Sequence, residues 1–311
     1  MTAAVDMHVH LAPVLPGWPN EQGKHVIDGH AVGPAALYRP DELLEHVHGH
    51  GLDKALVSPP PPFFRQELGA SDAETWVTQL NDGFLTAVAG HPELLPLAYL
   101  PLEHPELAIV EHGRRASDHR WAGFCASAGG RSVSMAEPAL SRLWDALDEA
   151  GALMFLHPGM SPDERLQEFY LHNLVGNPVE TAIAAAQLVF GDVLPRHARL
   201  RILLLHGGGC VLDLVSRWDH GLATRRPGVR PLTEIPSVAV RRMYVDCLLH
   251  DRTGVDRAIE VFGADRMVLG SDWPFPMGTD DPRALVRHRG EHFTETIARV
   301  NAASALGRSV S

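Results

Sequence analysis

The sequence contains eight short apolar runs, each bounded by residues that interrupt regular structure. They are Ala4–His10, Lys54–Ser58, Pro96–Leu100, Trp121–Ala126, Ala152–His157, Arg201–His206, Met243–Leu248 and Met267–Asp272. Nearly continuous apolar character over five to seven residues is typical of a strand that is buried on both faces, as in a parallel sheet. The sequence therefore predicts eight parallel strands.

Amphipathic segments that read as helices separate these runs. The clearest are those from Ser71 to about Ala89, Glu137–Ala150, Asn177–Phe190 and Thr253–Phe262. Eight alternating strand and helix units in 311 residues predict a single (β/α)8 TIM-barrel domain over residues 1–311, with an open doubly wound sheet as the alternative. The stretch 11–36, rich in Pro, Gly and His, is too long for an ordinary connection, so we expect a long loop after the first strand that acts as a lid.

The charge balance and the apolar pattern limit the partners. The chain has 27 basic and 38 acidic residues, a net charge of −11, which argues against a nucleic-acid partner. Every apolar run is far shorter than the roughly 20 residues that a membrane span requires. The first residues lack a basic region followed by an apolar stretch. We therefore expect a cytoplasmic protein that acts on a small molecule.

Residues that can bind a metal ion recur where the predicted strands end. The first run ends in His8-Val9-His10, and others end in His157, His206 and Asp272. Residues two apart on a strand face the same side, and a barrel brings the ends of all its strands to one face. Three neutral imidazoles and a carboxylate suit Zn²⁺ or another divalent transition metal. The sequence thus predicts a metal site at the barrel mouth.

A second histidine group, His46, His48 and His50, competes with this site. His46 and His50 are four residues apart, so on a helix they would lie on the same face and could bind one metal ion. The group precedes the second predicted strand, which places it near the face of a barrel that seldom carries an active site. We therefore expect a solvated helix end there. Cys125 and Cys247 lie within apolar runs and are expected to be core residues.

Several longer motifs carry a resemblance to a known family. They are the His-x-His pair, LVGNPVETA (174–182), LLLHGGG (203–209), MYVDCLLHD (243–251) and LGSDWPFPMG (269–278). In this order and spacing they resemble the amidohydrolase-2 family, and within it the branch of α-amino-β-carboxymuconate-ε-semialdehyde decarboxylase and related metal-dependent decarboxylases. The resemblance covers nearly the whole chain and implies a barrel enzyme that removes CO2 without oxidation.

The resemblance also implies roles for individual residues. It gives metal ligation to His8, His10, His157 and Asp272, and it makes His206, together with Asp272, catalytic in proton transfer. It implies one divalent metal ion, zinc with manganese as the alternative, and a homodimer. Related two-metal hydrolases use a carbamylated lysine on the fourth strand; the fourth run here has no lysine, and none follows Lys54. A mononuclear centre is therefore expected.

The substrate-binding residues depart from the family pattern. Where the family holds the substrate carboxylate with an arginine before the second strand, the nearest arginine here is Arg39. Asn173 stands in place of a family tryptophan, and Arg225 or Arg226 corresponds to an arginine that the partner subunit supplies. Aromatic side chains just beyond the strand ends are expected to line the pocket: Phe63, Phe64, Trp273 and Phe275.

These features lead to a decarboxylase of a small carboxylated aromatic or unsaturated acid. The first alternative is a metal-dependent hydrolase of an amide, ester or lactone on the same site, because a metal-activated water could attack a carbonyl. A hydratase, in which the same metal-activated water adds to a double bond, is a further alternative. A ligand-binding protein on a barrel that has lost its catalysis is the alternative outside enzymology. Release of CO2 without uptake of water would distinguish the decarboxylase from these alternatives.

Overall fold

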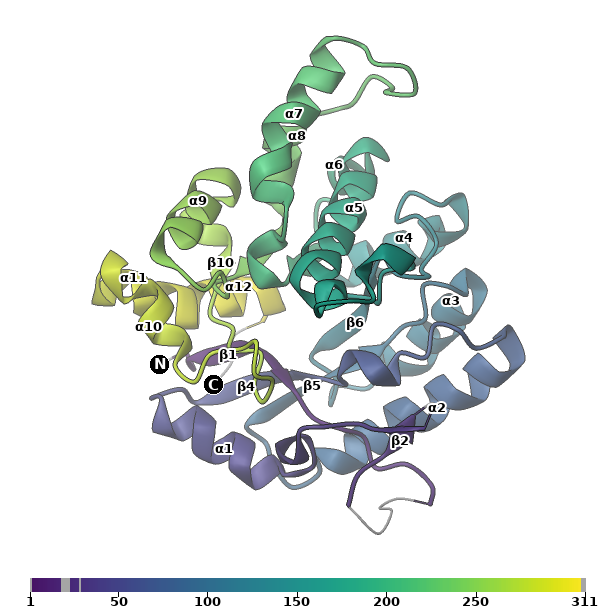
Figure 1. The fold of residues 1–311 in the computed structure, drawn as a ribbon, viewed down its shortest axis with the longest axis vertical. Coiled ribbons are helices and arrows are strands. Elements are labelled where there is room, and N and C mark those ends of the chain that lie inside the picture. The colour runs from purple at the N-terminus through teal and green to yellow at the C-terminus, as the bar shows by residue number, and fades with distance from the viewer. Residues whose placement is uncertain (1, 18–22, 28, 309–311) are drawn as a thin grey trace.

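Eight parallel strands follow one another around a barrel in the computed structural model, which describes residues 2–17, 23–27 and 29–308 (Figure 1). They are β1 (Val5–His10), β4 (Lys54–Ser58), β5 (Leu94–Tyr99), β6 (Gly123–Ala128), β7 (Leu153–Pro158), β8 (Arg201–Leu204), β9 (Tyr244–Asp246) and β10 (Met267–Val268). Each strand pairs in parallel with the next one along the chain. Each predicted run contains one of these strands or overlaps with it.

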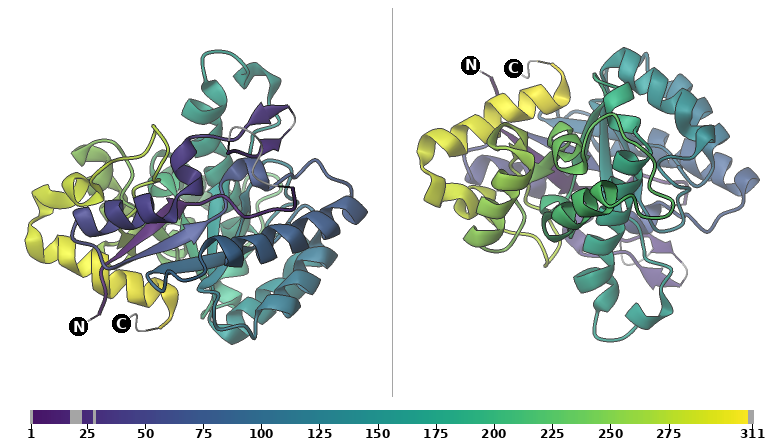
Figure 2. Two further views of the ribbon diagram at one scale, coloured as in Figure 1. Left: turned by 90° about the horizontal axis from the view of Figure 1, so that it is seen from below. Right: turned by 90° about the horizontal axis from the view of Figure 1, so that it is seen from above.

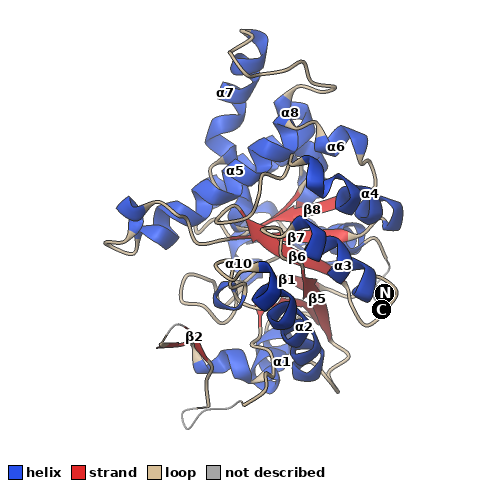
Figure 3. Ribbon diagram, turned by 90° about the vertical axis from the view of Figure 1, so that its right-hand side faces the viewer, coloured by secondary structure: helices blue, strands red, loops and turns tan. Residues whose placement is uncertain are grey.

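Backbone contacts between the last strand and the first close the barrel. The amide of Met7 donates to the carbonyl of Leu269 at 2.9 Å, and Val9 forms a parallel bridge with Trp273. An open doubly wound sheet would leave both of these edges unpaired or reverse the strand order. The predicted (β/α)8 barrel is therefore confirmed, and Figure 3 shows the helices packed outside the strands.

The helices surround the barrel and make connections between the strands (Figure 2). They are α1 (Pro40–Gly49), α2 (Ala70–Ala87), α3 (Pro105–Arg115), α4 (Ser141–Ala150), α5 (Asn177–Phe190), α6 (Val193–Arg196), α7 (Val211–Ala223), α8 (Pro236–Ala239), α9 (Arg252–Phe262), α10 (Pro282–Val286), α11 (Glu291–Glu295) and α12 (Ala302–Leu306). Gly151 ends α4 in the left-handed region, at φ 56°. The α2 helix begins one residue before the expected Ser71, and its N-cap, Gly69, offers no side chain to the helix.

Alternation along the strands divides the apolar core into two layers. Leu97, Cys125 and Phe155 belong to the layer inside the barrel. The residue after each of these, Ala98, Ala126 or Leu156, packs in the layer between barrel and helices. This period of two carries through β7, so that His157, two residues after Phe155, shares the inward direction. The barrel interior is filled below the mouth, which leaves the mouth for polar side chains.

The segment after β1 is more structured than a plain loop. Its described residues include an antiparallel pair, β2 (Val26–Ile27) and β3 (His30–Ala31), and residues 18–22 and 28 lie outside the described part. The backbone of Val14 bonds to Gly83 of α2 at 3.0 Å, which ties the start of the segment to the barrel. Whether the segment works as a lid stays a prediction. Among the described residues, none of the helices has the length and apolar character of a membrane span.

Candidate metal centre

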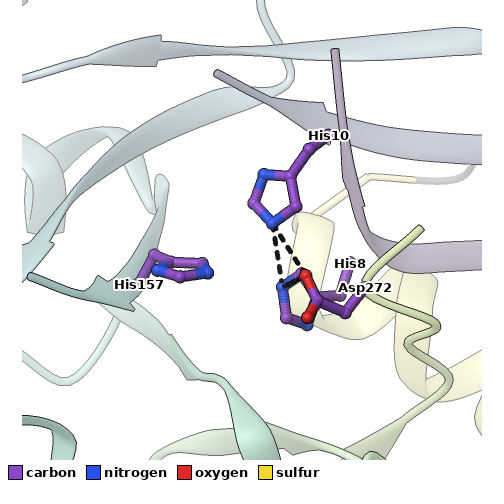
Figure 4. Close-up of side chains that lie close together, drawn as sticks. All are labelled: His8, His10, His157 and Asp272. Atoms are coloured by element: carbon purple, nitrogen blue, oxygen red, sulfur yellow. Dashed lines mark hydrogen bonds and ion pairs between the residues drawn. The ribbon is translucent and has the colours of Figure 1, made fainter. Parts of the chain in front are cut away.

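Four side chains predicted from the strand ends converge at the barrel mouth. One ligand atom from each of His8, His10, His157 and Asp272 lies within 4.8 Å of the others, and all four residues are buried (Figure 4). The Nε2 atoms of His8 and His10 are 3.2 Å apart. Oδ1 of Asp272 lies 3.1 Å from Nε2 of His10 and 3.4 Å from Nε2 of His8. The predicted convergence is therefore present in the structure.

The opposite nitrogen of each imidazole ring has a hydrogen-bond partner of its own. Nδ1 of His8 lies 2.7 Å from Oδ2 of Asp246. Nδ1 of His10 lies 3.0 Å from the Ser58 hydroxyl, and Nδ1 of His157 lies 3.0 Å from the carbonyl of Pro158. A partner on Nδ1 fixes the ring orientation and leaves Nε2 as the free donor atom. All three rings are thus arranged as metal-binding histidines usually are.

The four donor atoms fit a single divalent ion. Two atoms that share a tetrahedral zinc ion at about 2.0–2.1 Å are roughly 3.3 Å apart, close to the separations among His8, His10 and Asp272. Oδ1 of Asp272 is buried and accepts no hydrogen bond from the described residues. An unpaired carboxylate oxygen in such a place is costly unless a cation compensates it. Three nitrogens and one oxygen could therefore hold a transition metal here.

The surroundings of the cluster favour the neutral form of His10 and His157 and the ionised form of Asp272. Burial lowers the pKa of His157 well below its usual range, and burial also lowers the pKa of His10. Burial alone would raise the pKa of Asp272, but the neighbouring imidazoles of His8 and His10 hold it well below its usual range. At His8, burial opposes the charged form, but the carboxylates of Asp272 and Asp246 raise the pKa of the ring. Neutral imidazoles and an ionised carboxylate are the forms that bind metal ions, so a metal ion at His8 competes with a proton.

His206 lies next to this cluster without belonging to it. Its Nε2 is 3.9 Å from Oδ2 of Asp272, and its side chain is 20% exposed. Both His206 and Asp272 adopt positive φ, 52° and 59°, a region that few residues other than glycine occupy. Such strain tends to concentrate at functional positions, where it directs a side chain. His206 therefore lies beside the cluster with its ring partly exposed.

The remaining predicted residues occupy several environments. The Phe275 ring lies 5.3 Å from the His10 ring, between centroids. Phe63 is fully buried, and Phe64 is 6.3 Å from the His157 ring. The Trp273 ring packs outside the barrel, 6.0 Å from His46. The polar candidates are on other elements. Arg39 pairs with Glu42 on the surface, and Asn173 is half-buried in a π-helical turn (His172–Gly176). Arg225 and Arg226 are both exposed after α7.

The expectation of a solvated histidine group on α1 is wrong for one of its members. The His46 side chain is only 8% exposed, and its Nε2 lies 3.8 Å from Oδ2 of the buried Asp6. The ring is covered because it packs between the barrel wall and Trp273. His48 is exposed, as expected. Cys125 and Cys247 are both fully buried, which confirms them as core residues.

Two residues that organise the site were missed from the sequence. Asp246 accepts from the ring of His8 and also from the backbone amides of His206 and Gly207, at 3.1 and 2.8 Å. Ser58 contacts the ring of His10. The signal was available for Asp246, because a lone carboxylate within the buried run Met243–Leu248 requires a partner.

A parallel barrel with metal-binding side chains at its mouth defines the class: a (β/α)8 protein with a candidate mononuclear metal centre. The chain belongs to the amidohydrolase family whose model matches residues 5–308. A curated relative, 2-amino-3-carboxymuconate-6-semialdehyde decarboxylase of Dictyostelium discoideum, is 26% identical over 315 residues, which is 94% of this chain and 87% of that protein. The resemblance drawn from the motifs is confirmed.

Solved structures share the fold. The 5-carboxyvanillate decarboxylase of Sphingomonas paucimobilis superposes with a TM-score of 0.82 at 20% identity, over 99% of this chain and 100% of that one. The dihydroxybenzoic acid decarboxylase of Polaromonas sp. JS666, solved with bound manganese, gives a TM-score of 0.79 at 20% identity, over 99% and 97%. Both matches extend over essentially the entire barrel.

Proposed function

We propose that the protein is a metal-dependent, non-oxidative decarboxylase of a small carboxylated aromatic or unsaturated acid. The observation that carries this proposal is the convergence of three imidazole Nε2 atoms and Asp272, with His206 beside them. The similarity to a decarboxylase over 94% of the chain supports the same class of reaction. We further propose that residues 1–311 act as one catalytic domain.

The proposed cofactor is one divalent ion held by His8, His10, His157 and Asp272. Zinc suits a set of three nitrogens and one oxygen, and manganese, present in the Polaromonas structure, is the alternative. An ion held there supplies a positive charge that polarises a substrate oxygen. No lysine lies on β6 to bridge a second ion.

The proposed proton donor is His206. A proton from its Nε2 adds to the substrate carbon that bears the carboxylate. The bond from this carbon to the carboxylate then breaks, CO2 leaves, and the electron pair of the broken bond restores the unsaturated system. Asp272 is proposed to take part in this proton transfer, because its Oδ2 lies 3.9 Å from Nε2 of His206.

Substrate binding is proposed for Phe275, whose ring lies 5.3 Å from the His10 ring, and for Phe63, Trp273 and Asn173. We propose a homodimer in which Arg225 of one subunit reaches the other subunit's site, since its exposed position beyond α7 leaves it free to do so. Arg39 is the remaining candidate for the substrate carboxylate. The cytoplasmic location stays a prediction from the sequence.

A screen of carboxylated arenes and unsaturated acids tests the proposal, with CO2 and substrate absorbance followed together. We expect one CO2 for each substrate molecule consumed and no water in the product. A ring opened or a bond cleaved by one water molecule, without CO2, would favour the hydrolase instead. Loss of activity on chelation, restored by zinc or manganese, is expected for either reaction and establishes that the metal is required.

A further inference from the structure

A second group of polar side chains lies at the opposite end of the barrel, where β8, β9 and β10 begin. Arg201 and Tyr244 are the first residues of β8 and β9, and Arg266 directly precedes β10. They line a pocket of about 300 Å³ together with Ala198, Arg199, Leu200, Arg242 and Ser304. The candidate metal ligands lie at or beyond the other ends of their strands, so this pocket is a separate feature.

The positive charge of the pocket is only partly compensated. Arg242 is paired with Glu234 through two bonds, of 2.8 and 2.6 Å. The nearest carboxylate to Arg266 is that of Asp265, at 3.5 Å, and that carboxylate is 74% exposed. Arg201 has no carboxylate within 4.0 Å among the described residues. Within the described part of the chain, Arg201 therefore has no carboxylate partner and Arg266 has only an exposed one, although the net charge of the chain is −11.

The hydrogen-bond donors of these arginines are also incompletely used. A guanidinium has five N–H donors. Arg201 donates one bond, to the carbonyl of Gly151, within the described residues. Arg266 donates from Nε to the carbonyl of Arg241 at 2.9 Å and from Nη1 to the Tyr244 hydroxyl at 3.2 Å. Several donors on both side chains therefore have no partner among the residues that the structure describes, and a ligand could use them.

Capping of a helix explains only part of this arrangement. Arg199 donates to the last carbonyls of α4, those of Asp148 and Glu149, which is a common role for arginine at a helix C-terminus. The Arg201 bond to Gly151 belongs to the same cap. Arg266 has no such role, because its partners are Tyr244 and a carbonyl between α8 and β9. Helix capping therefore accounts for Arg199 and Arg201 but not for Arg266.

We propose that this pocket binds a small phosphate-bearing anion. Guanidinium groups match the oxygens of phosphate with paired, charge-assisted bonds, and their charge is retained at every physiological pH. Arg201 and Arg266 supply the charge, and the Tyr244 hydroxyl, which lies 2.7 Å from Oγ of Ser304, supplies a neutral polar contact. The site does not depend on the proposed decarboxylase activity.

Isothermal titration of the metal-loaded protein with pyrophosphate, at constant ionic strength set by chloride, tests the proposal. We expect saturable binding that Arg201→Gln and Arg266→Gln each weaken by about tenfold or more. Arg257→Gln is the matched control, since Arg257 is an exposed residue of α9 that pairs with Glu260. Orthophosphate in a second titration shows whether a single phosphate group is enough for binding.

Pyrophosphate could also bind a metal ion, so Asp272→Asn serves as a second control. Binding that persists in Asp272→Asn and Arg257→Gln but weakens in the two pocket variants supports the proposal. Circular dichroism reports whether each variant folds. If Arg201→Gln does not fold, the comparison rests on Arg266→Gln. Absence of saturable binding, equal weakening by Arg257→Gln, or loss of binding in Asp272→Asn alone would overturn it.

Discussion

Nδ1 of His8 lies 2.7 Å from Oδ2 of Asp246, and both side chains are completely buried. The same carboxylate accepts the backbone amides of His206 and Gly207, so that one side chain holds both a candidate ligand and the turn that carries the candidate proton donor. Asp246 therefore connects the candidate metal site to the candidate acid–base residue. Its removal should affect both.

Asp246→Asn is expected to weaken metal binding by about 10–100-fold, because the amide orients His8 less strongly than the carboxylate does. Competition with a coloured chelator measures this affinity. Asp145→Asn is the matched control, since that carboxylate is 66% exposed and distant from the cluster. Equal affinities for the two variants would show that Asp246 does not support the site.

Ser58→Ala is expected to weaken metal binding less than Asp246→Asn does. The hydroxyl contacts Nδ1 of His10 at 3.0 Å, and a bond to a neutral group contributes about 1 kcal/mol, whereas one to a charged group contributes about 1.5–3 kcal/mol. The same chelator competition gives the order. An effect larger than that of Asp246→Asn would contradict this ranking of the two partners.

His206→Gln is expected to keep its metal and lose its activity. The ring is beside the cluster rather than in it, and general acid catalysis typically contributes about 10²–10⁴-fold. Metal content by mass spectrometry and the rate of CO2 release are measured on the same preparation. Loss of metal together with activity would make His206 a ligand instead.

Gly270→Ala is expected to disturb the same region through packing. A Cβ at this position would lie 2.8 Å from the Cβ of Asp246 and 2.9 Å from the Cβ of His8, atoms that cannot move without their strands. We expect a loss of about 1–3 kcal/mol in the free energy of unfolding, measured in urea, and weaker metal binding. Gly49→Ala has open space and is the control; similar losses in both would contradict the packing explanation.

The strands and the candidate metal ligands were predictable because both depend on local patterns. Lys54–Ser58 coincides with β4, since a strand buried on both faces is continuously apolar. His157 and Asp272 were recognised from their places at the ends of apolar runs. Parallel strands in a barrel then bring such residues to one face whatever their distance in sequence.

The partners of the ligands were not predictable in this way. His8 and Asp246 are 238 residues apart, and only the closed barrel makes β9 accessible to the ring of His8. The burial of His46 likewise depends on where α1 packs against the barrel, and the spacing of the histidines along α1 does not reveal this. Ser71 and Glu74 have the spacing of a capping box, which places the N-cap at Ser71, whereas the N-cap of α2 is Gly69, two residues earlier.

Metal analysis of the purified protein, combined with X-ray absorption at the metal edge, tests most directly whether four side chains from distant strands bind one ion. We expect one ion per chain, bound by three imidazole nitrogens and one carboxylate oxygen at about 2.0–2.2 Å. His157→Ala and Asp272→Ala should each lose it. Two ions per chain, a sulfur ligand, or full metal content in both variants would contradict this centre.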